Sequence, residues 1–150
     1  MDTITNDTGI TALFEIFFSC QKVLLHSLDY REIKFSRHQF YTLLALGGRE
    51  SMTMGQVAES LAASREQATR VVASLVEEGY VERFYDETNR KRVYVRLTLK
   101  GREFIEKEKN YVRGQLESRF AQLSDAEMEE FLTCLSSLKA ILKKVEIVDK

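Results

Sequence analysis

The chain of 150 residues contains no proline, and it has only two cysteines and two histidines. Because proline is absent, long helices can run without a forced kink. Cys20 and Cys134 lie far apart and form no Cys-x-x-Cys pair. Together with His26 and His38 they offer too few ligands at usable spacing for a zinc site. We therefore expect no metal and no cofactor.

Catalytic motifs are also missing. The sequence has no glycine-rich phosphate loop, no nucleophile elbow and no paired helical histidines, so we expect no enzyme. No uninterrupted apolar run approaches the roughly 20 residues that a membrane span needs. The acidic, polar start MDTITNDTGI differs from a signal or transit peptide. These absences leave the cytoplasm as the expected compartment and exclude the membrane as an expected partner.

Positive charge is concentrated in one part of the chain, although the formal net charge is −1. Residues 1–63 carry 5 basic and 7 acidic side chains, residues 64–102 carry 9 and 6, and residues 103–150 carry 8 and 10. The middle segment is therefore positive by three charges between two segments that are each negative by two. Such asymmetry points to a local rather than a general affinity for anions.

Helical spacing dominates the sequence. Three segments begin with a hydroxyl residue followed three positions later by glutamine, which is the pattern of a capping box. These pairs are Ser36 and Gln39, Thr53 and Gln56, and Ser64 and Gln67. Ser124 and Glu127 predict a similar start for the final helix, and Thr98 can cap the helix before it. The first helix, over about residues 8–30, is apolar around much of its circumference, which favours burial against a second subunit.

After Gly79 the apolar period changes from that of a helix to that of a strand. Val81, Arg83 and Tyr85, and then Val93 and Val95, alternate with polar positions, as in strands with one buried face. Residues 86–92 connect the two runs, so we predict a β-hairpin. The predicted fold is mainly α with a small β-hairpin wing, in which a winged helix-turn-helix lies between N- and C-terminal helices.

The helix that begins after Ser64 has the features of a DNA-recognition helix. A helix of this kind enters the major groove and presents its first turns to base edges. The side chains offered here are Ser64, Arg65, Glu66, Gln67, Thr69 and Arg70. The same residues also fit the solvated face of an ordinary amphipathic helix, and the preceding helix and the hairpin favour double-stranded DNA as the partner.

The predicted hairpin tip carries three consecutive cations, Arg90, Lys91 and Arg92. Their mutual repulsion is relieved if they neutralise DNA phosphates or enter a minor groove and release counterions. Asp86 and Glu87 at the start of the turn can pair with one of the arginines and stabilise the wing. A solvated turn is the simpler alternative.

From about Phe40 to Gly101, the pattern MTMGQVAESLAASREQATRVVASLVEEGYVER…DETNRKRVYVRLTLKG resembles the MarR (multiple antibiotic resistance regulator) family. The wing carries the most specific part of this resemblance, in Asp86, Arg90, Lys91, Leu97, Thr98 and Gly101. The sequence departs from the family at Lys91, where arginine is commoner, and at Asn89, which replaces a frequent aspartate. Ala62 and Ala63 replace a frequent Gly-Val in the turn.

The resemblance implies a homodimer that reads a palindromic operator and represses, or sometimes activates, transcription, often under control of a small ligand. It implies one domain over residues 1–150. Residues 34–100 would form the DNA-binding winged lobe, and residues 8–30 and 102–148 would form dimerisation helices. Within the winged lobe, Arg90 takes the family's wing-tip role in the minor groove.

Three further hypotheses remain open at the level of sequence. An effector pocket is expected from the aromatic residues Phe14, Phe17, Tyr30, Phe40 and Tyr41, although aromatic clusters on helices are more often core. Thiol-based redox sensing would involve Cys20, but no adjacent cation argues for a lowered thiol pKa, and a small buried hydrophobic residue is the better interpretation of both cysteines. The third is a winged-helix module that binds protein and never DNA.

Overall fold

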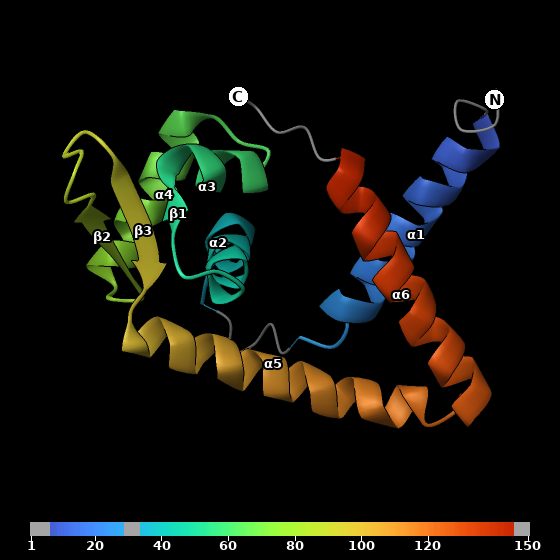
Figure 1. Ribbon diagram of the computed structural model, residues 1–150. Helices are drawn as coiled ribbons and strands as arrows, with labels where there is room; N and C mark the ends of the chain where they lie inside the picture. The colour runs from blue at the N-terminus through green and yellow to red at the C-terminus, as the bar shows by residue number, and fades with distance from the viewer. Residues whose placement is uncertain (1–6, 29–33, 146–150) are drawn as a thin grey trace. The chain divides into compact units, whose positions relative to one another are not determined.

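The computed structural model describes residues 7–28 and 34–145. The chain divides into two compact units, residues 1–112 and 113–150, and the division falls inside a long helix. All the helices expected from the sequence are present among the described residues (Figure 1). In chain order the elements are α1 (Asp7–Leu25), α2 (Arg37–Gly47), β1 (Met52–Thr53), α3 (Met54–Ser60), α4 (Arg65–Glu77), β2 (Val81–Tyr85), β3 (Val93–Leu97), α5 (Leu99–Phe120) and α6 (Asp125–Val145).

The capping residues form the hydrogen bonds that their spacing predicts. At the start of α2, α3 and α4 the cap hydroxyl accepts from the backbone N–H of the glutamine three residues on, at 3.2 Å. The glutamine side chain accepts in return from the cap N–H. Ser124 and Glu127 exchange the same two bonds at the start of α6. Reciprocal capping satisfies two backbone donors at each site and so fixes where each helix begins.

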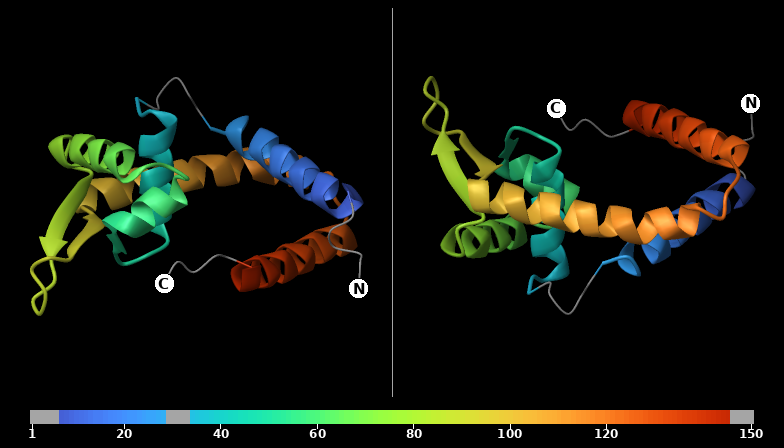
Figure 2. Two further views of the ribbon diagram at one scale, coloured as in Figure 1. Left: turned by 90° about the horizontal axis from the view of Figure 1, so that it is seen from above. Right: turned by 90° about the horizontal axis from the view of Figure 1, so that it is seen from below.

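A three-stranded antiparallel sheet supports the hairpin, in the order β1-β3-β2. The hairpin strands pair as the sequence predicts, from Val81 opposite Leu97 to Tyr85 opposite Val93. The sequence analysis missed β1, which pairs Met52 with Val95. A strand of two residues has no period to detect, and its pairing partner is more than forty residues further along the chain. Seen from above and from below, the loop of the hairpin projects away from the helices around it (Figure 2).

The predicted buried face of β2 is wrong beyond its first residue. Val81 is buried, but Arg83 and Tyr85 are exposed, and the exposed fraction of Tyr85 is 62%. Burial persists in β3 at Val95 and Leu97, near the base of the hairpin. The prediction fails because the helices cover only the base of the hairpin. The alternating sequence pattern of β2 continues beyond the part of the strand that the core covers.

The core of the winged lobe lies where α2, α3 and α4 meet the sheet, and α5 closes it from below in Figure 1. Its centre is aliphatic, and the fully buried side chains include Leu43, Val57, Val72, Leu75, Val95 and Ile105. Aromatic rings lie beside this core at the start of α5. Phe104 makes edge-to-face contacts with Phe35 at 5.0 Å and Phe40 at 6.5 Å between centroids. Such contacts join the residue before α2, and α2 itself, to α5.

Helix α1 is apolar and exposed in the single chain. Phe14 and Phe18 have exposed fractions of 60% and 61%. By length and composition alone the segment Thr8–Leu25 could cross a membrane, although Glu15, Gln21 and Lys22 interrupt its apolar residues. Core helices of soluble proteins pass the same test. The apolar surface of α1 needs cover that the described part of the chain does not supply.

In the second unit, residues 113–150, the described helices are the end of α5 and α6. Phe120 and Phe131 contact each other with ring centroids 5.2 Å apart. No described residue of α6 is buried, and large apolar side chains along it are exposed. They are Leu132, Leu135, Ile141, Leu142 and Val145.

Candidate nucleic-acid interface

Helices α3 and α4 are joined by a tight turn that sets the angle between them. Ala62 adopts a φ of 48°, in the left-handed region that disfavours residues with a side chain. Ala63 N–H then donates to the carbonyl of Ala58 at 3.0 Å, and Ser64 caps α4. The sequence therefore places a strained residue where the chain must reverse between the two helices.

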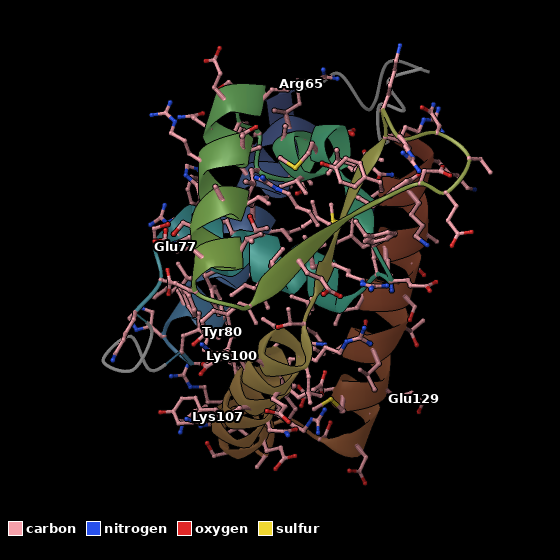
Figure 3. The ribbon with its side chains drawn as sticks, turned by 90° about the vertical axis from the view of Figure 1, so that its left-hand side faces the viewer. Arg65, Glu77, Tyr80, Lys100, Lys107 and Glu129 are labelled. Atoms are coloured by element: carbon pink, nitrogen blue, oxygen red, sulfur yellow. The ribbon has the colours of Figure 1, made fainter. Side chains whose placement is uncertain are left out.

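Helix α4 separates a buried face from an exposed one. Ala68, Val72 and Leu75 are buried in the core. On the other side, Glu66, Arg70 and Glu77 are exposed. Arg65 and Glu77 mark the two ends of the helix in Figure 3. Thirteen residues give α4 a length of about 20 Å, enough to lie along a major groove.

The structure distinguishes among the side chains that the sequence assigned to base contact. Ser64 and Gln67 are engaged with each other in the capping box. Thr69 Oγ1 donates to the carbonyl of Arg65 at 2.7 Å. The side chains of Arg65, Glu66 and Arg70 make no hydrogen bond or ion pair with any other described residue. Of the six, these three therefore keep all their side-chain donors and acceptors for an external partner.

Two exposed residues of α4 were missed by the sequence analysis. Ala73 follows Arg70 by three positions and Thr69 by four, so it lies on the same face of the helix. Val76, with an exposed fraction of 36%, follows Ala73 by three positions. Their spacing from Thr69 and Arg70 was the available signal. It was passed over because alanine and valine in an amphipathic helix are usually core residues.

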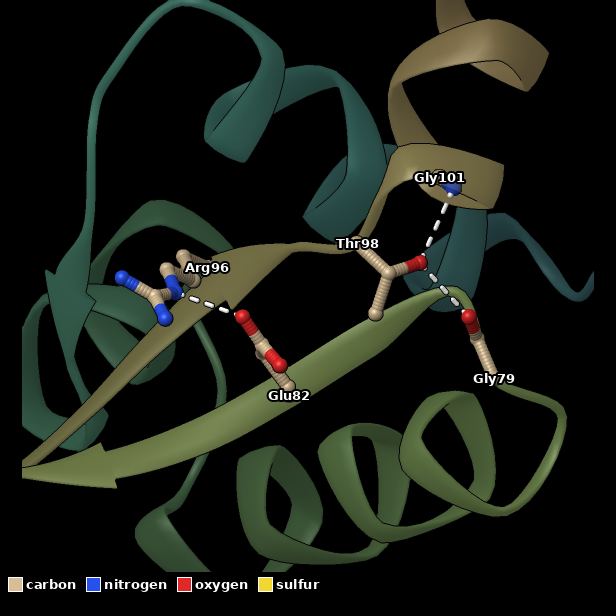
Figure 4. A network of polar contacts seen from close by, with 5 residues as sticks. All are labelled: Gly79, Glu82, Arg96, Thr98 and Gly101. Carbon is tan, nitrogen blue, oxygen red and sulfur yellow. Dashed lines mark hydrogen bonds and ion pairs between the residues drawn. The ribbon is translucent and has the colours of Figure 1, made fainter.

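The far end of α4 is held by the first turn of α5. Thr98 Oγ1 donates to the carbonyl of Gly79 at 2.6 Å and accepts from the N–H of Gly101 at 3.1 Å (Figure 4). Lys100 Nζ donates to the carbonyl of Glu78 at 2.7 Å and lies 4.2 Å from the ring centroid of Tyr80. Figure 3 shows Lys100 and Tyr80 together below the helix. A cation at a helix C-terminus also complements the helix dipole.

The loop of the wing is organised by hydrogen bonds rather than by ion pairs. Asp86 Oδ1 accepts from Thr88 N–H at 2.8 Å and from the Thr88 hydroxyl at 2.7 Å. The two bonds from Thr88 hold the pKa of Asp86 below its ordinary value, and Arg92 contributes a smaller electrostatic effect. Asn89 Oδ1 accepts from Lys91 N–H at 3.1 Å. Among the described residues no ion pair joins Asp86 or Glu87 to an arginine.

The three wing cations are exposed. Arg90, Lys91 and Arg92 make no ion pair within the described part of the chain. Arg96, by contrast, is bound within the hairpin, where it lies 2.6 Å from Glu82 Oε1 and stacks over Phe84 at 4.6 Å from the ring centroid. Figure 4 shows the pair with Glu82. The tip therefore carries uncompensated positive charge, and Arg83 on β2 is likewise exposed without an ion pair to a described residue.

Residues 33–92 match the MarR family model. By this match, residues 33–92 form a domain of the MarR type. No curated protein matches the sequence significantly, but many solved structures share the fold. RV1404 from Mycobacterium tuberculosis has a TM-score of 0.74 at 19% identity, over 88% of this chain and 92% of that one. FabT from Streptococcus pneumoniae, solved in complex with DNA, has a TM-score of 0.64 at 24% identity, over 91% and 94%.

BpsR from Bordetella bronchiseptica, whose DNA binding is regulated by 6-hydroxynicotinic acid, has the same fold. Its TM-score is 0.60 at 20% identity, over 87% of this chain and 98% of that one. These likenesses extend the MarR fold over most of the chain, well beyond the segment that the family model matches. The fold class predicted from the sequence, mainly α with a hairpin wing, is confirmed.

A cavity of about 240 Å³ opens beside the MarR winged lobe. It is lined by Leu24, Leu28, Phe40, Leu44, Glu108, Lys109 and Val112, which come from α1 and its end, α2 and α5. Of the predicted pocket residues only Phe40 lines this cavity. Phe14 and Phe17 are exposed on α1, Tyr41 packs against the core, and Tyr30 lies outside the described residues.

Cys20 and Cys134 are exposed free thiols in the single chain. The interpretation of both as buried small hydrophobic residues is therefore wrong for the chain alone. Their apolar neighbours in the sequence suggested burial. In the single chain, the apolar surfaces of the two helices that carry them are exposed. In the part of the chain that the structure describes, no group of histidine, cysteine and carboxylate side chains could hold a metal ion.

Proposed function

We propose that this MarR-family protein is a transcriptional regulator that binds double-stranded DNA as a homodimer and represses transcription from a palindromic operator. The observation that carries the proposal is the pairing of two exposed, unengaged features on one lobe. They are the polar face of α4 around Glu66 and Arg70, and the cationic wing tip. Arginine donates twice to guanine, and a glutamate accepts from cytosine.

The proposed DNA-contacting residues fall into two groups. Those on and before α4 read bases or position the helix on the backbone, and those on the wing meet phosphates or a minor groove. The residues are Ser64, Arg65, Glu66, Gln67, Thr69 and Arg70, with Arg90, Lys91 and Arg92. Asp86 acts on the wing indirectly, through the turn that it forms with Thr88.

A second copy of the chain is the proposed cover for the apolar surfaces. Ile10, Leu13 and Phe17 on α1 have exposed fractions of 49%, 51% and 55%, and the apolar side chains of α6 are similarly exposed. Contiguous apolar surface of this kind marks an interface. We therefore propose residues 8–30 and 102–148 as dimerisation helices of a single domain over residues 1–150. A twofold dimer presents two α4 helices, which is the geometry that a palindrome matches.

We propose that a small-molecule effector binds in the cavity beside α2. The support is its apolar lining and its contact with Phe40, which packs on Phe104. Phe104 in turn contacts Tyr80, three residues after the end of α4, with ring centroids 5.7 Å apart. Ligand binding at Phe40 can thus act on the end of the recognition helix.

As a DNA-binding regulator, the protein is proposed to work in the cytoplasm.

Selection of bound DNA from a random duplex pool tests the proposal. The expected product is an inverted repeat whose half-site centres are about 34 Å, or one helical turn, apart. Arg70→Ala should alter the selected sequence, because arginine discriminates guanine from other bases by about 1–3 kcal/mol. Lys107→Ala on α5, outside the winged lobe, serves as a control. Failure to enrich any sequence, together with the absence of salt-sensitive duplex binding, would contradict the proposal.

A further inference from the structure

The recognition helix α4 carries an apolar row among its polar side chains. Thr69, Ala73 and Val76 follow one another at spacings of four and three residues, so they form a continuous row on the exposed side. Ala73 also follows Arg70 by three residues, which places it in the middle of the face that is proposed to meet DNA. An alanine there leaves room for a close approach of the helix to a base edge.

The hydroxyl of Thr69 is already engaged within the helix. Thr69 Oγ1 donates to the carbonyl of Arg65 at 2.7 Å. This bond uses the only proton of the hydroxyl, so Thr69 offers an external partner its γ-methyl and an acceptor oxygen but no donor. The row from Thr69 to Ala73 therefore offers two methyl groups four residues apart.

The neighbouring polar groups limit what else this face can read. Gln67, a residue type suited to adenine, uses its side-chain oxygen to accept from Ser64 N–H at 3.2 Å. Arg70 is exposed and makes no ion pair with the described residues. The face thus combines the free guanidinium groups of Arg65 and Arg70 with methyl groups beside them. In the major groove the chemical group that matches a methyl is the C5-methyl of thymine.

We propose that Thr69 and Ala73 are specificity-determining residues that contact thymine C5-methyl groups, next to a guanine contacted by Arg70. This proposal rests on the proposed function, since it assigns bases to the recognition helix. It implies that each half-site contains a guanine with thymine nearby. Burying one methyl group changes affinity by about fourfold.

Thymine-to-uracil replacement tests the proposal, because deoxyuridine differs from thymidine only by the missing C5-methyl. The full chain is titrated by fluorescence anisotropy with a selected duplex and with versions in which single thymines are replaced. At one or two thymines per half-site, uracil should weaken binding about fourfold. With Ala73→Gly the ratio of the two affinities should fall to about one at the thymine that Ala73 contacts.

A matched pair at Thr69 separates the methyl from the hydroxyl. Thr69→Ser keeps the bond to Arg65 and removes the methyl, so it should lose the uracil effect. Thr69→Val keeps a methyl and removes the hydroxyl, so it should retain the effect. Because each result is a ratio measured on one protein, a loss of helix stability in Ala73→Gly cancels. Ala126→Gly, an exposed alanine in the first turn of α6, serves as the control for that substitution.

The outcomes distinguish this inference from the proposed function. Salt-sensitive binding with an unchanged uracil effect in Ala73→Gly and Thr69→Ser would overturn the assignment and leave the DNA-binding function standing. The same holds if no thymine methyl in the selected half-site affects affinity. Absence of duplex binding by the unaltered protein would overturn both.

Discussion

Gln39 Nε2 donates a hydrogen bond of 2.7 Å to the hydroxyl of Ser74, which ties the first turn of α2 to helix α4. Gln39 also closes the capping box of α2 by accepting from Ser36 N–H at 2.8 Å. One side chain thus fixes both the start of α2 and the position of α4. Spacing along the sequence predicted the first of these roles and gave no sign of the second.

Removing the hydroxyl of Ser74 should destabilise the lobe without changing its fold. Ser74→Ala leaves a partly buried amide donor of Gln39 without its acceptor, at a cost of about 1 kcal/mol in the free energy of unfolding. Urea denaturation followed by circular dichroism measures the change. Ser118→Ala, which removes an exposed bond to Gln115 within α5, should change stability by much less. Equal effects of the two substitutions would argue against a tie between α2 and α4.

The turn before α4 offers a stabilising substitution. Ala62 has a φ of 48°, which costs an L-residue about 1–2 kcal/mol and costs glycine little. Ala62→Gly should therefore raise the free energy of unfolding by up to about 1 kcal/mol after the added entropy of glycine in the unfolded chain. Ala63→Gly is the control. Ala63 is not in the left-handed region, so this substitution should lower the stability of the protein. A loss of stability in Ala62→Gly would show that the turn relaxes in solution.

Two glycines of α5 should respond to alanine in opposite directions. A β-carbon at Gly101 would collide with the carbonyl oxygen of Tyr80 and press on Leu97. Gly101→Ala should therefore destabilise the lobe by about 1–3 kcal/mol and displace α5 from the end of α4. At Gly114 a β-carbon would meet nothing within 4 Å, and Gly114→Ala should stabilise the helix by up to about 1 kcal/mol. Thermal melting of both variants checks whether their stabilities change in opposite directions. Equal effects of the two substitutions would show that α5 does not pack closely against Tyr80.

Charge removal at the wing tip should alter the salt dependence of DNA binding. If Arg90 neutralises one phosphate or minor-groove site, Arg90→Ala lowers the slope of log affinity against log salt by about one. The loss of affinity should be similar for all duplex sequences. Lys107→Ala removes a cation from α5, outside the winged lobe, and should leave the slope unchanged. A slope unchanged in Arg90→Ala would mean that the wing stays clear of the duplex.

The turn at Asp86 should be sensitive to acid. Hydrogen bonds from Thr88 lower the pKa of Asp86, so folding favours the charged carboxylate. Its contribution is present above the ordinary aspartate pKa and is lost as pH falls through the lowered value. Thr88→Val removes the hydroxyl donor and should raise the pKa of Asp86 toward the ordinary value, as measured by NMR titration of the side-chain carboxyl. Thr133→Val on α6 is the control, and a pKa of Asp86 that stays unchanged in Thr88→Val would contradict this cause.

The sequence predicted those parts of the fold that local chemistry dictates. The hydroxyl–glutamine pairs at Ser36, Thr53 and Ser64 located three helix starts, because a capping box involves residues only three positions apart. β1 and the exposure of Arg83 depend on how far the core extends, which no local pattern records. The exposed face of α4 was only partly predicted. An alanine fits a buried or an exposed position equally well, so the exposure of Ala73 became apparent only from the structure.

The stoichiometry of the protein on its selected duplex tests the central claim most directly. Light scattering coupled to size-exclusion chromatography gives the mass of the complex for the full inverted repeat and for a duplex with one half-site scrambled. We predict two chains per full site, and with the scrambled duplex a complex of the same composition that forms at higher protein concentration. A complex with a single chain on the full site, or no complex at all, would contradict a dimer that places one α4 in each half of the operator.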